Sequence, residues 1–296
     1  MQYSGTDGVA DTVPDAVHEP IDFMNLFVDD SVLEMIITET NRNANPVIAQ
    51  NTLSPEARIG NWVDTDKSEI RTFLGLLIWM GLVRMPTLDA YWRQSVMYSN
   101  SITASTMTRN RFQLLLRLFH FADNQAKEPN DKLHKVKELA NMLQHKFQTA
   151  KKPGVDIVID ETMVPFRGRL SFRQYIPGKA SKYGVKVFKL CDKNGYTFSF
   201  SIYAGKTDAE SGLGLASDVV LKLTQPYLDA GRTLATDNYY TSVPLARALL
   251  HRKTNLVGTL RMNRKGLPES IRQSKLKKGE VFFTAEQGRN CSSQVA

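Results

Sequence analysis

The sequence has few cysteines: Cys191 and Cys291 are the only two in 296 residues. Two cysteines supply neither the disulfide framework of a small secreted domain nor the four ligands of a structural zinc site. Disulfide-poor chains are typical of reducing environments. We therefore expect the protein to work in a reducing compartment.

Long hydrophobic runs are also missing. The longest, residues 73–83, is too short to cross a bilayer and contains two glycines, so it predicts a buried helix. The N-terminus is acidic and polar, without the basic and apolar segments of a signal peptide. We expect no membrane partner.

Three further signatures of chemistry are absent. Gly212-Leu213-Gly214 lacks the flanking pattern of a phosphate loop, and Ser211 and Ser242 have no histidine partner in view. The five histidines share no ligand spacing, and Asp192 and Asp208 are typical of turns. We therefore expect no small-molecule cofactor and no nucleophilic triad.

Charge is unevenly distributed along the chain. Residues 1–70 contain 13 acidic and 3 basic residues, whereas residues 71–296 contain 17 acidic and 35 basic residues. A body this basic indicates an anionic partner, and no basic amphipathic helix with a clean apolar face is evident. The charge pattern therefore favours nucleic acid over an acidic membrane.

The first half of the chain has helical patterns. Ser31 with Glu34, and Asp66 with Glu69, have the spacing of capping boxes. The apolar spacing and the proline breaks predict helices at residues 31–46, 66–83, 88–93, 106–120 and 134–149. Residues 1–20 are polar and acidic and predict a disordered lead.

The second half changes character after residues 151–154. Alternating or β-branched runs predict strands at 155–160, 186–191, 196–203, 232–236 and 255–260, with helices at 211–228 and 244–252. Asn194-Gly195 predicts the turn of a hairpin. The order β-β-β-α-β-α-β predicts an α+β fold: a ribonuclease-H-like mixed sheet with flanking helices, preceded by a helical N-terminal domain.

Two carboxylates follow strands of this predicted sheet. Asp160 closes the first strand and Asp237 closes the fourth. In this layout the two strands are parallel neighbours, so their carboxyl ends meet at one edge. Two adjacent carboxylates predict a site for Mg²⁺ or Mn²⁺ and metal-assisted chemistry on a phosphodiester. The alternative is a turn aspartate followed by a solvated basic hairpin, and these residues do not decide between the two.

Longer motifs around these aspartates resemble the core of piggyBac-type transposases. They are residues 159–161, 165–169, 174–177, 182–184, 190–192, 236–242 and 256–261, with Asn41-Arg42 and residues 119–121 in the helical front. The resemblance covers roughly residues 25–285. Ala180, where the family often has proline, is a minor departure.

This resemblance implies a metal-dependent DNA transposase that uses three aspartates, with Asp160 as the first and Asp237 as the second. No aspartate follows Asp237 in this sequence; Glu269, Glu280 and Glu286 are the later acids. The cysteine-rich zinc module common in the family is also absent. A site that lacks one ligand is expected to lose most of its catalytic power.

The resemblance further implies duplex DNA as partner and the nucleus as location, with a homodimer left open. The expected DNA contacts are Arg167, Arg169, Arg173, Lys179, Lys182, Lys186, Arg261 and Lys265, and Arg272, Lys275, Lys277 and Lys278 prolong the basic body. Two alternatives remain: a ribonuclease-H-like nuclease that does not transpose, and a domesticated DNA-binding or protein-interaction module.

The predicted domain organisation has four parts. Residues 1–24 form the disordered lead, and residues 25–153 form the helical domain, which in the family serves dimerisation or DNA binding. Residues 154–262 form the ribonuclease-H-like core. Residues 263–296 begin a truncated insertion with a divergent tail.

Overall fold

The structure is a computed structural model that describes residues 2–49, 57–95, 97–98, 101–205 and 212–273, and the backbone of 281–286 and 289–294. It divides into two compact units, one of residues 11–150 and one of residues 1–10 with 151–296. Some residues named in the sequence analysis lie outside the described residues: Lys275, Lys277, Lys278, Asp208, Ser211 and Glu280.

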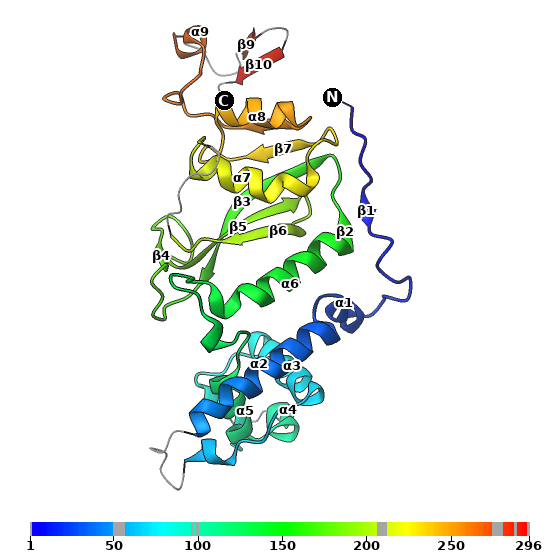
Figure 1. Cartoon of the computed structure of the whole chain (residues 1–296), viewed down its shortest axis with the longest axis vertical. Helices are drawn as coiled ribbons and strands as arrows, with labels where there is room; N and C mark the ends of the chain where they lie inside the picture. The colour runs from blue at the N-terminus through cyan, green and yellow to red at the C-terminus, as the bar shows by residue number, and fades with distance from the viewer. Residues whose placement is uncertain are drawn as a thin grey trace. The chain divides into compact units, whose positions relative to one another are not determined.

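The unit of residues 11–150 is helical, as the sequence predicts (Figure 1). Its elements are α1 (Pro20–Phe27), α2 (Asp30–Ile48), η1 (Arg58–Asn61), α3 (Lys67–Leu82), η2 (Leu88–Trp92), α4 (Ser101–Thr106), α5 (Arg109–Leu118), η3 (Asn124–Ala126) and α6 (His134–Ala150). Their core contains the ring of Phe73, whose centroid lies 5.1 Å from that of Phe112 and 5.2 Å from that of Phe119.

The helix ends follow local capping chemistry. Asp66 caps α3, because its carboxylate accepts a hydrogen bond of 2.8 Å from the backbone N–H of Glu69, as predicted. α2 is capped by Asp29 rather than by Ser31, and it continues through Pro46 to Ile48. The predicted helix at 106–120 begins at Arg109 instead, because the Thr108 side chain caps α5 there.

The other unit contains the predicted mixed sheet. Its strands are β3 (Asp156–Pro165), β4 (Gln174–Tyr175), β5 (Tyr183–Asp192), β6 (Thr197–Ile202), β7 (Thr233–Thr236) and β8 (Asn255–Gly258). Their order is β4-β5-β3-β7-β8, with β6 also paired to β5. β3 is antiparallel to β5 and parallel to β7, and β7 is parallel to β8. The α+β, ribonuclease-H-like prediction is therefore confirmed.

Helices accompany this sheet, with α7 (Leu215–Thr224) in front of the strands in the view of Figure 1. η4 (Gln225–Tyr227), α8 (Val243–His251) and α9 (Glu269–Gln273) follow along the chain. The core side chains of β3, Ile157 and Ile159, are at most 1% exposed, and Leu190 and Leu234 on the neighbouring strands are fully buried. Each such side chain contributes about 1.5–3 kcal/mol to folding.

Several sequence-based boundaries need correction. β3 does not end at Asp160 but continues to Pro165, because β5 offers hydrogen-bonding partners along that whole length. In the hairpin turn Gly195 adopts a positive φ of 88°, whereas Asn194 does not. The predicted helix at 211–228 is shorter, since α7 covers only Leu215–Thr224.

The N-terminal lead, predicted to be disordered, contains a short strand. β1 (Gly8–Val9) pairs antiparallel with β2 (Lys151–Lys152). The Tyr3 hydroxyl donates a hydrogen bond of 3.1 Å to the carbonyl oxygen of Pro153. The polar composition of the lead gave no sign of this long-range backbone pairing.

Residues near the end of the chain form one more pair of strands. β9 (Val281–Glu286) and β10 (Arg289–Gln294) are antiparallel.

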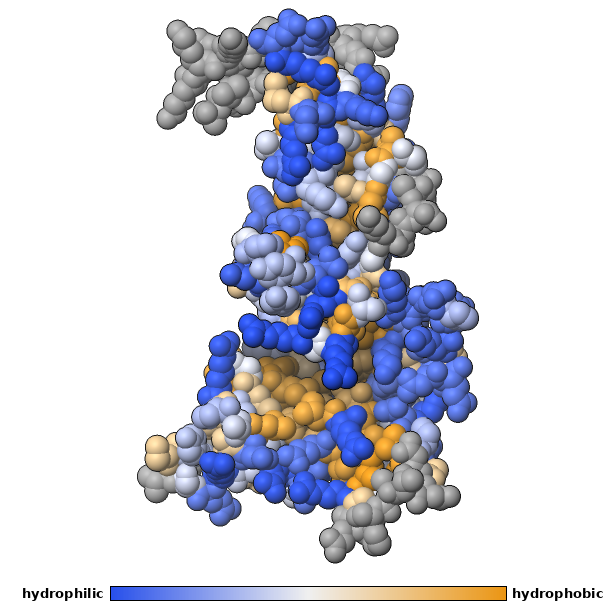
Figure 2. All heavy atoms as spheres, turned by 90° about the vertical axis from the view of Figure 1, so that its left-hand side faces the viewer, coloured by the Kyte–Doolittle hydropathy of each residue, from blue (hydrophilic) through white to orange (hydrophobic). Residues whose placement is uncertain are grey.

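Hydrophilic residues cover much of the face drawn in Figure 2, with hydrophobic residues exposed in patches between them. No helix in the described ranges is both long and apolar enough to span a membrane.

Candidate functional site

Asp160 and Asp237 lie next to each other in the register of two parallel strands. Ile159 of β3 pairs with Thr236 of β7, and each aspartate directly follows one member of this last pair. Residues in register on parallel strands share one face, and neighbouring strands lie about 4.8 Å apart. The tertiary structure therefore brings together two residues that are 77 positions apart in the chain.

Both aspartates are exposed and hydrogen-bonded to the local backbone. Asp160 Oδ1 accepts a bond of 2.7 Å from the N–H of Glu161. Asp237 Oδ1 accepts one of 2.9 Å from the N–H of Tyr239, at the start of the loop that leads into α8. These bonds orient each carboxylate without burying it, so its other oxygen can serve as a ligand.

Sequence analysis assigned no role to two side chains beside this pair, Glu161 and Tyr240. Glu161 Oε2 accepts a bond of 3.3 Å from the Tyr240 hydroxyl, and its Oε1 lies 3.3 Å from Lys179 Nζ. Burial would raise the pKa of Glu161, but the charges of Lys186 and Lys179 outweigh it and hold the pKa below its ordinary value. Glu161 is therefore a charged carboxylate engaged by protein partners.

Tyr240 lies close enough to three acids to be affected by their charges. Burial raises the pKa of its hydroxyl, and the negative charges of Glu161, Asp237 and Asp160 raise it further. The side chain is 1% exposed, so its hydroxyl is held inside the unit beneath the acidic edge. A pattern of Tyr-Tyr after a strand-ending aspartate gives no sign of this contact.

The donor set of the edge suits a hard divalent cation held by few protein ligands. Asp160 and Asp237 offer carboxylate oxygens, which Mg²⁺ and Mn²⁺ prefer. Within the described residues no group of three His, Cys, Asp or Glu side chains could hold a metal ion. Among the described residues, Asp160 and Asp237 are therefore the two carboxylates at this edge that would hold such an ion.

The six predicted DNA-contacting residues from Arg167 to Lys186 fall into two groups. Arg173 donates to the carbonyl oxygens of Arg167 (2.9 Å) and Gly168 (3.1 Å), and Lys186 Nζ lies 4.8 Å from the ring centroids of Phe188 and Tyr239. With Lys179 on Glu161, these cations have partners inside the unit. Arg167, Arg169 and Lys182 are exposed, in the segment that joins β3 to β5.

More cations follow β8 at the same edge of the sheet. Arg261 donates to Asn238 Oδ1 from Nε (3.1 Å) and from Nη2 (2.8 Å), and Lys265 is exposed. Arg264, which the sequence gave no reason to select, donates from Nη2 to the carbonyl oxygens of Asn238 (3.1 Å) and Tyr239 (2.7 Å). Arg264 therefore holds the loop that follows Asp237.

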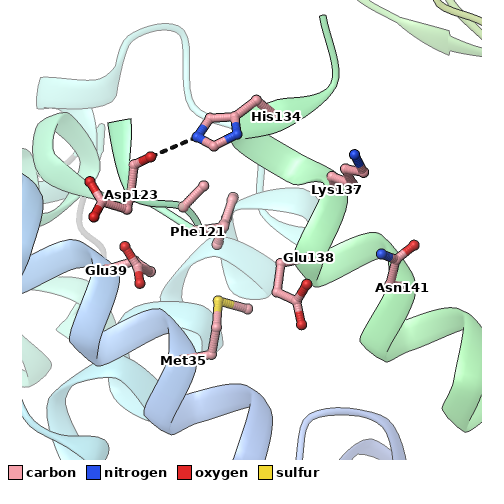
Figure 3. A pocket seen from close by; sticks show the side chains of 9 residues that line it. Met35, Glu39, Phe121, Asp123, His134, Lys137, Glu138 and Asn141 are labelled. Atoms are coloured by element: carbon pink, nitrogen blue, oxygen red, sulfur yellow. Dashed lines mark hydrogen bonds between the residues drawn. The ribbon is translucent and has the colours of Figure 1, made fainter. Parts of the chain in front are cut away.

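A separate pocket of about 260 Å³ lies in the helical unit, between α2 and α6 (Figure 3). His134 Nε2 there is 2.7 Å from the carbonyl oxygen of Asp123, and Glu39 pairs with Arg42 at 2.7 Å. Polar side chains of this pocket therefore have structural partners, and none of the predicted site residues lines it.

The fold defines a class of protein built on a ribonuclease-H-like mixed sheet. A family model described as Transposase IS4 matches residues 19–291. The chain belongs to this transposase family and, within it, to the piggyBac type.

Two human proteins of this type are similar to the chain. PiggyBac transposable element-derived protein 3 is 28% identical over 247 residues, which cover 82% of this chain and 40% of that protein. PiggyBac transposable element-derived protein 2 is 25% identical over 276 residues, or 90% of this chain and 45% of that protein. The chain thus spans less than half the length of these relatives.

A solved structure of a piggyBac transposase is also similar to the chain. The cryo-EM structure of a piggyBac transposase synaptic complex with hairpin DNA matches with a TM-score of 0.81 and 27% identity. The match covers 95% of this chain and 59% of the transposase chain.

Proposed function

We propose that the chain is a piggyBac transposase-derived module that binds double-stranded DNA. The observation that carries the proposal is a set of exposed cations in the segments that follow β3 and β8, the two strands on either side of β7. Arg167, Arg169 and Lys182 come from the segment after β3, and Arg261 and Lys265 come from the segment after β8. The solved relative, which is a complex with hairpin DNA, supports the same class of ligand.

The sheet topology supports the proposal, because both segments that carry these cations follow strands that run in the same direction. β3, β7 and β8 run parallel, so the segments that leave their carboxyl ends emerge on the same side. Residues 151–296 contain 24 basic and 12 acidic residues, which adds a long-range attraction for phosphates. Binding of this kind weakens steeply with salt, because condensed counterions are released from DNA.

Fluorescence anisotropy with a labelled duplex tests the proposal. The double variant Arg167→Ala/Arg169→Ala should weaken binding and reduce the slope of log K against log salt by about 0.9 for each phosphate that the variant no longer neutralises. The matched control is Lys193→Ala/Lys222→Ala, which removes the same charge from exposed positions on the β5–β6 turn and on α7. Equal weakening in both doubles, or no binding by the wild type, would refute a specific DNA-binding edge.

A second candidate function is metal-dependent cleavage of a DNA strand, favoured by the pairing of Ile159 with Thr236, the residues that directly precede Asp160 and Asp237. These two carboxylates would hold a Mg²⁺ or Mn²⁺ ion, which would supply a Lewis acid for the phosphodiester. The chain's own contribution is to orient the carboxylates through the N–H groups of Glu161 and Tyr239 and to hold the DNA backbone on the flanking cations.

Mn²⁺ binding can be measured without any reaction, by the decrease of the free-ion electron paramagnetic resonance signal. Asp160→Asn and Asp237→Asn should each weaken Mn²⁺ binding, whereas Asp156→Asn, at the opposite end of β3, should not. Nicking of a plasmid by the wild type but not by Asp160→Asn would establish cleavage. If neither protein nicks the plasmid, the cleavage proposal is refuted and DNA binding remains the proposed function of this chain.

We also propose a nuclear location, because duplex DNA is the expected partner. Imaging of the tagged chain in eukaryotic cells tests it, and exclusion from the nucleus would contradict it.

A further inference from the structure

A cavity of about 630 Å³ lies immediately beside the loop that follows Asp237. Three segments line it: the start of α7 (residues 213–217), the loop and first turn after β7 (239–244) and the segment after β8 (261–265). Its volume is within the range of sites that hold small organic ligands. Neither the proposed carboxylate site nor the basic segment after β3 accounts for it.

The cavity has an aromatic wall. Tyr239 lines it and is half-buried, and its ring meets that of Tyr240 edge to face, with centroids 4.9 Å apart. Lys186 Nζ lies 4.8 Å from the Tyr239 ring centroid, so this ring is held in place by its neighbours. An immobilised ring beside a positive charge is the surface on which nucleobases stack in single-strand binding proteins.

The cavity is also positively charged. Arg261, Arg264 and Lys265 line it, and none of its lining residues is acidic. Arg264 is committed to the carbonyl oxygens of Asn238 and Tyr239, whereas Lys265 is exposed at the rim. In the described part of the chain, no carboxylate forms an ion pair with Arg261 or Lys265. These two side chains are suited to a phosphate group.

We propose that this cavity binds one nucleotide unit, with its base against Tyr239 and its phosphate on Arg261 and Lys265. The inference rests on the proposed DNA binding when the nucleotide belongs to a DNA strand; a free mononucleotide has the same chemistry. An unpaired nucleotide of a duplex enters such a pocket more readily than a paired one, because it pays no unpairing energy. The pocket would then hold a nucleotide next to Asp237.

Three ligands distinguish a nucleotide within a DNA strand from a free mononucleotide. They are a fully paired duplex, the same duplex with one unpaired adenine, and free dAMP. Anisotropy measures the two duplexes, and calorimetric titration measures dAMP. The wild type should bind the duplex with the unpaired adenine at least about fivefold more tightly than the paired duplex, which corresponds to one stacked base. Tyr239→Ala should bring this ratio close to one, whereas Tyr239→Phe, which retains the ring, should keep it.

Two further variants guard against a folding defect. Lys265→Ala changes an exposed side chain and should lower the ratio without affecting folding, and Tyr175→Ala, an exposed tyrosine on β4 outside the cavity, should leave it unchanged. Binding of dAMP that depends on Tyr239, with no preference between the duplexes, would assign the free nucleotide as ligand. Equal affinity for both duplexes together with no dAMP binding would overturn the nucleotide-binding proposal. Failure to bind either duplex would refute the DNA-binding proposal instead. In that case the dAMP titration alone tests whether the cavity binds a nucleotide.

Discussion

The hydroxyl of Tyr240 donates a hydrogen bond of 3.3 Å to the carboxylate of Glu161, which is 79 residues earlier in the chain. This bond links the loop after β7 to β3, the two segments that carry Asp237 and Asp160. It spans the same two neighbouring strands as the proposed metal ligands. The Glu161–Tyr240 contact therefore ties the two halves of the candidate site together.

Tyr240→Phe should lower the free energy of unfolding by about 1 kcal/mol, because Glu161 loses a buried donor while the ring keeps its packing. Urea unfolding measures the change. Tyr175→Phe is the matched control, since Tyr175 is 55% exposed and should be close to neutral. Equal effects of the two changes would contradict a stabilising role for the Glu161 contact.

Glu161 should make stability depend on pH. Its pKa is lowered in the folded protein from an ordinary value of 4.5, so its stabilising effect is fully present above that pH. The effect disappears as the pH falls through the lowered pKa, where the folded carboxylate takes up a proton. The gap in unfolding free energy between wild type and Glu161→Gln should therefore shrink between about pH 7 and about pH 3. A gap that stays constant or grows toward acid would contradict this assignment.

Asp192 should be important for the hairpin between β5 and β6. Its Oδ1 accepts bonds from the N–H groups of Asn194 (2.8 Å) and Tyr196 (2.9 Å), and its Oδ2 lies 2.5 Å from Lys151 Nζ. The turn role predicted for this residue is thus confirmed. Asp192→Ala should cost about 2–3 kcal/mol, because a partly buried lysine is left without its partner and the turn bonds are removed as well.

The control for that change is Asp30→Ala. Asp30 pairs with Lys67 and Arg71, but its side chain is 64% exposed. Exposed ion pairs contribute little, so Asp30→Ala should decrease the free energy of unfolding much less than Asp192→Ala does. If thermal unfolding gave Asp30→Ala the larger effect, burial would not be what sets the value of the Asp192 contacts.

Gly258 should resist substitution, because β7 and the following loop approach its backbone closely. A Cβ atom there would lie 2.3 Å from the carbonyl oxygen of Thr236 and 2.4 Å from Thr241 Oγ1. Gly258→Ala should destabilise the protein by about 1–3 kcal/mol, because the added carbon forces the backbone apart. At Gly60 no atom lies within 4 Å of the added carbon, so Gly60→Ala should change the unfolding free energy by less than about 1 kcal/mol. Equal tolerance at both positions would contradict the close approach at Gly258.

Periodicity and local chemistry were sufficient for most of the secondary structure. The Asp66–Glu69 cap and the apolar spacing that follows it gave α3, and the β-branched run after Val155 gave the start of β3. Predictions from local sequence were wrong where pairing with a distant segment determines the extent of a strand. β3 passes Asp160 because β5 pairs with it, and the acidic lead forms β1 because β2 offers an edge.

By itself the sequence determined the order of helices and strands, the basic character of the second half and the two aspartates that follow apolar runs, since each depends on neighbouring residues or on composition. Only the tertiary structure decided the register that places Ile159 beside Thr236, that Glu161 accepts a bond from Tyr240, and that Tyr239 and Arg261 line one cavity. The physical reason is that these relations depend on strand register and loop packing, which join residues far apart in the chain.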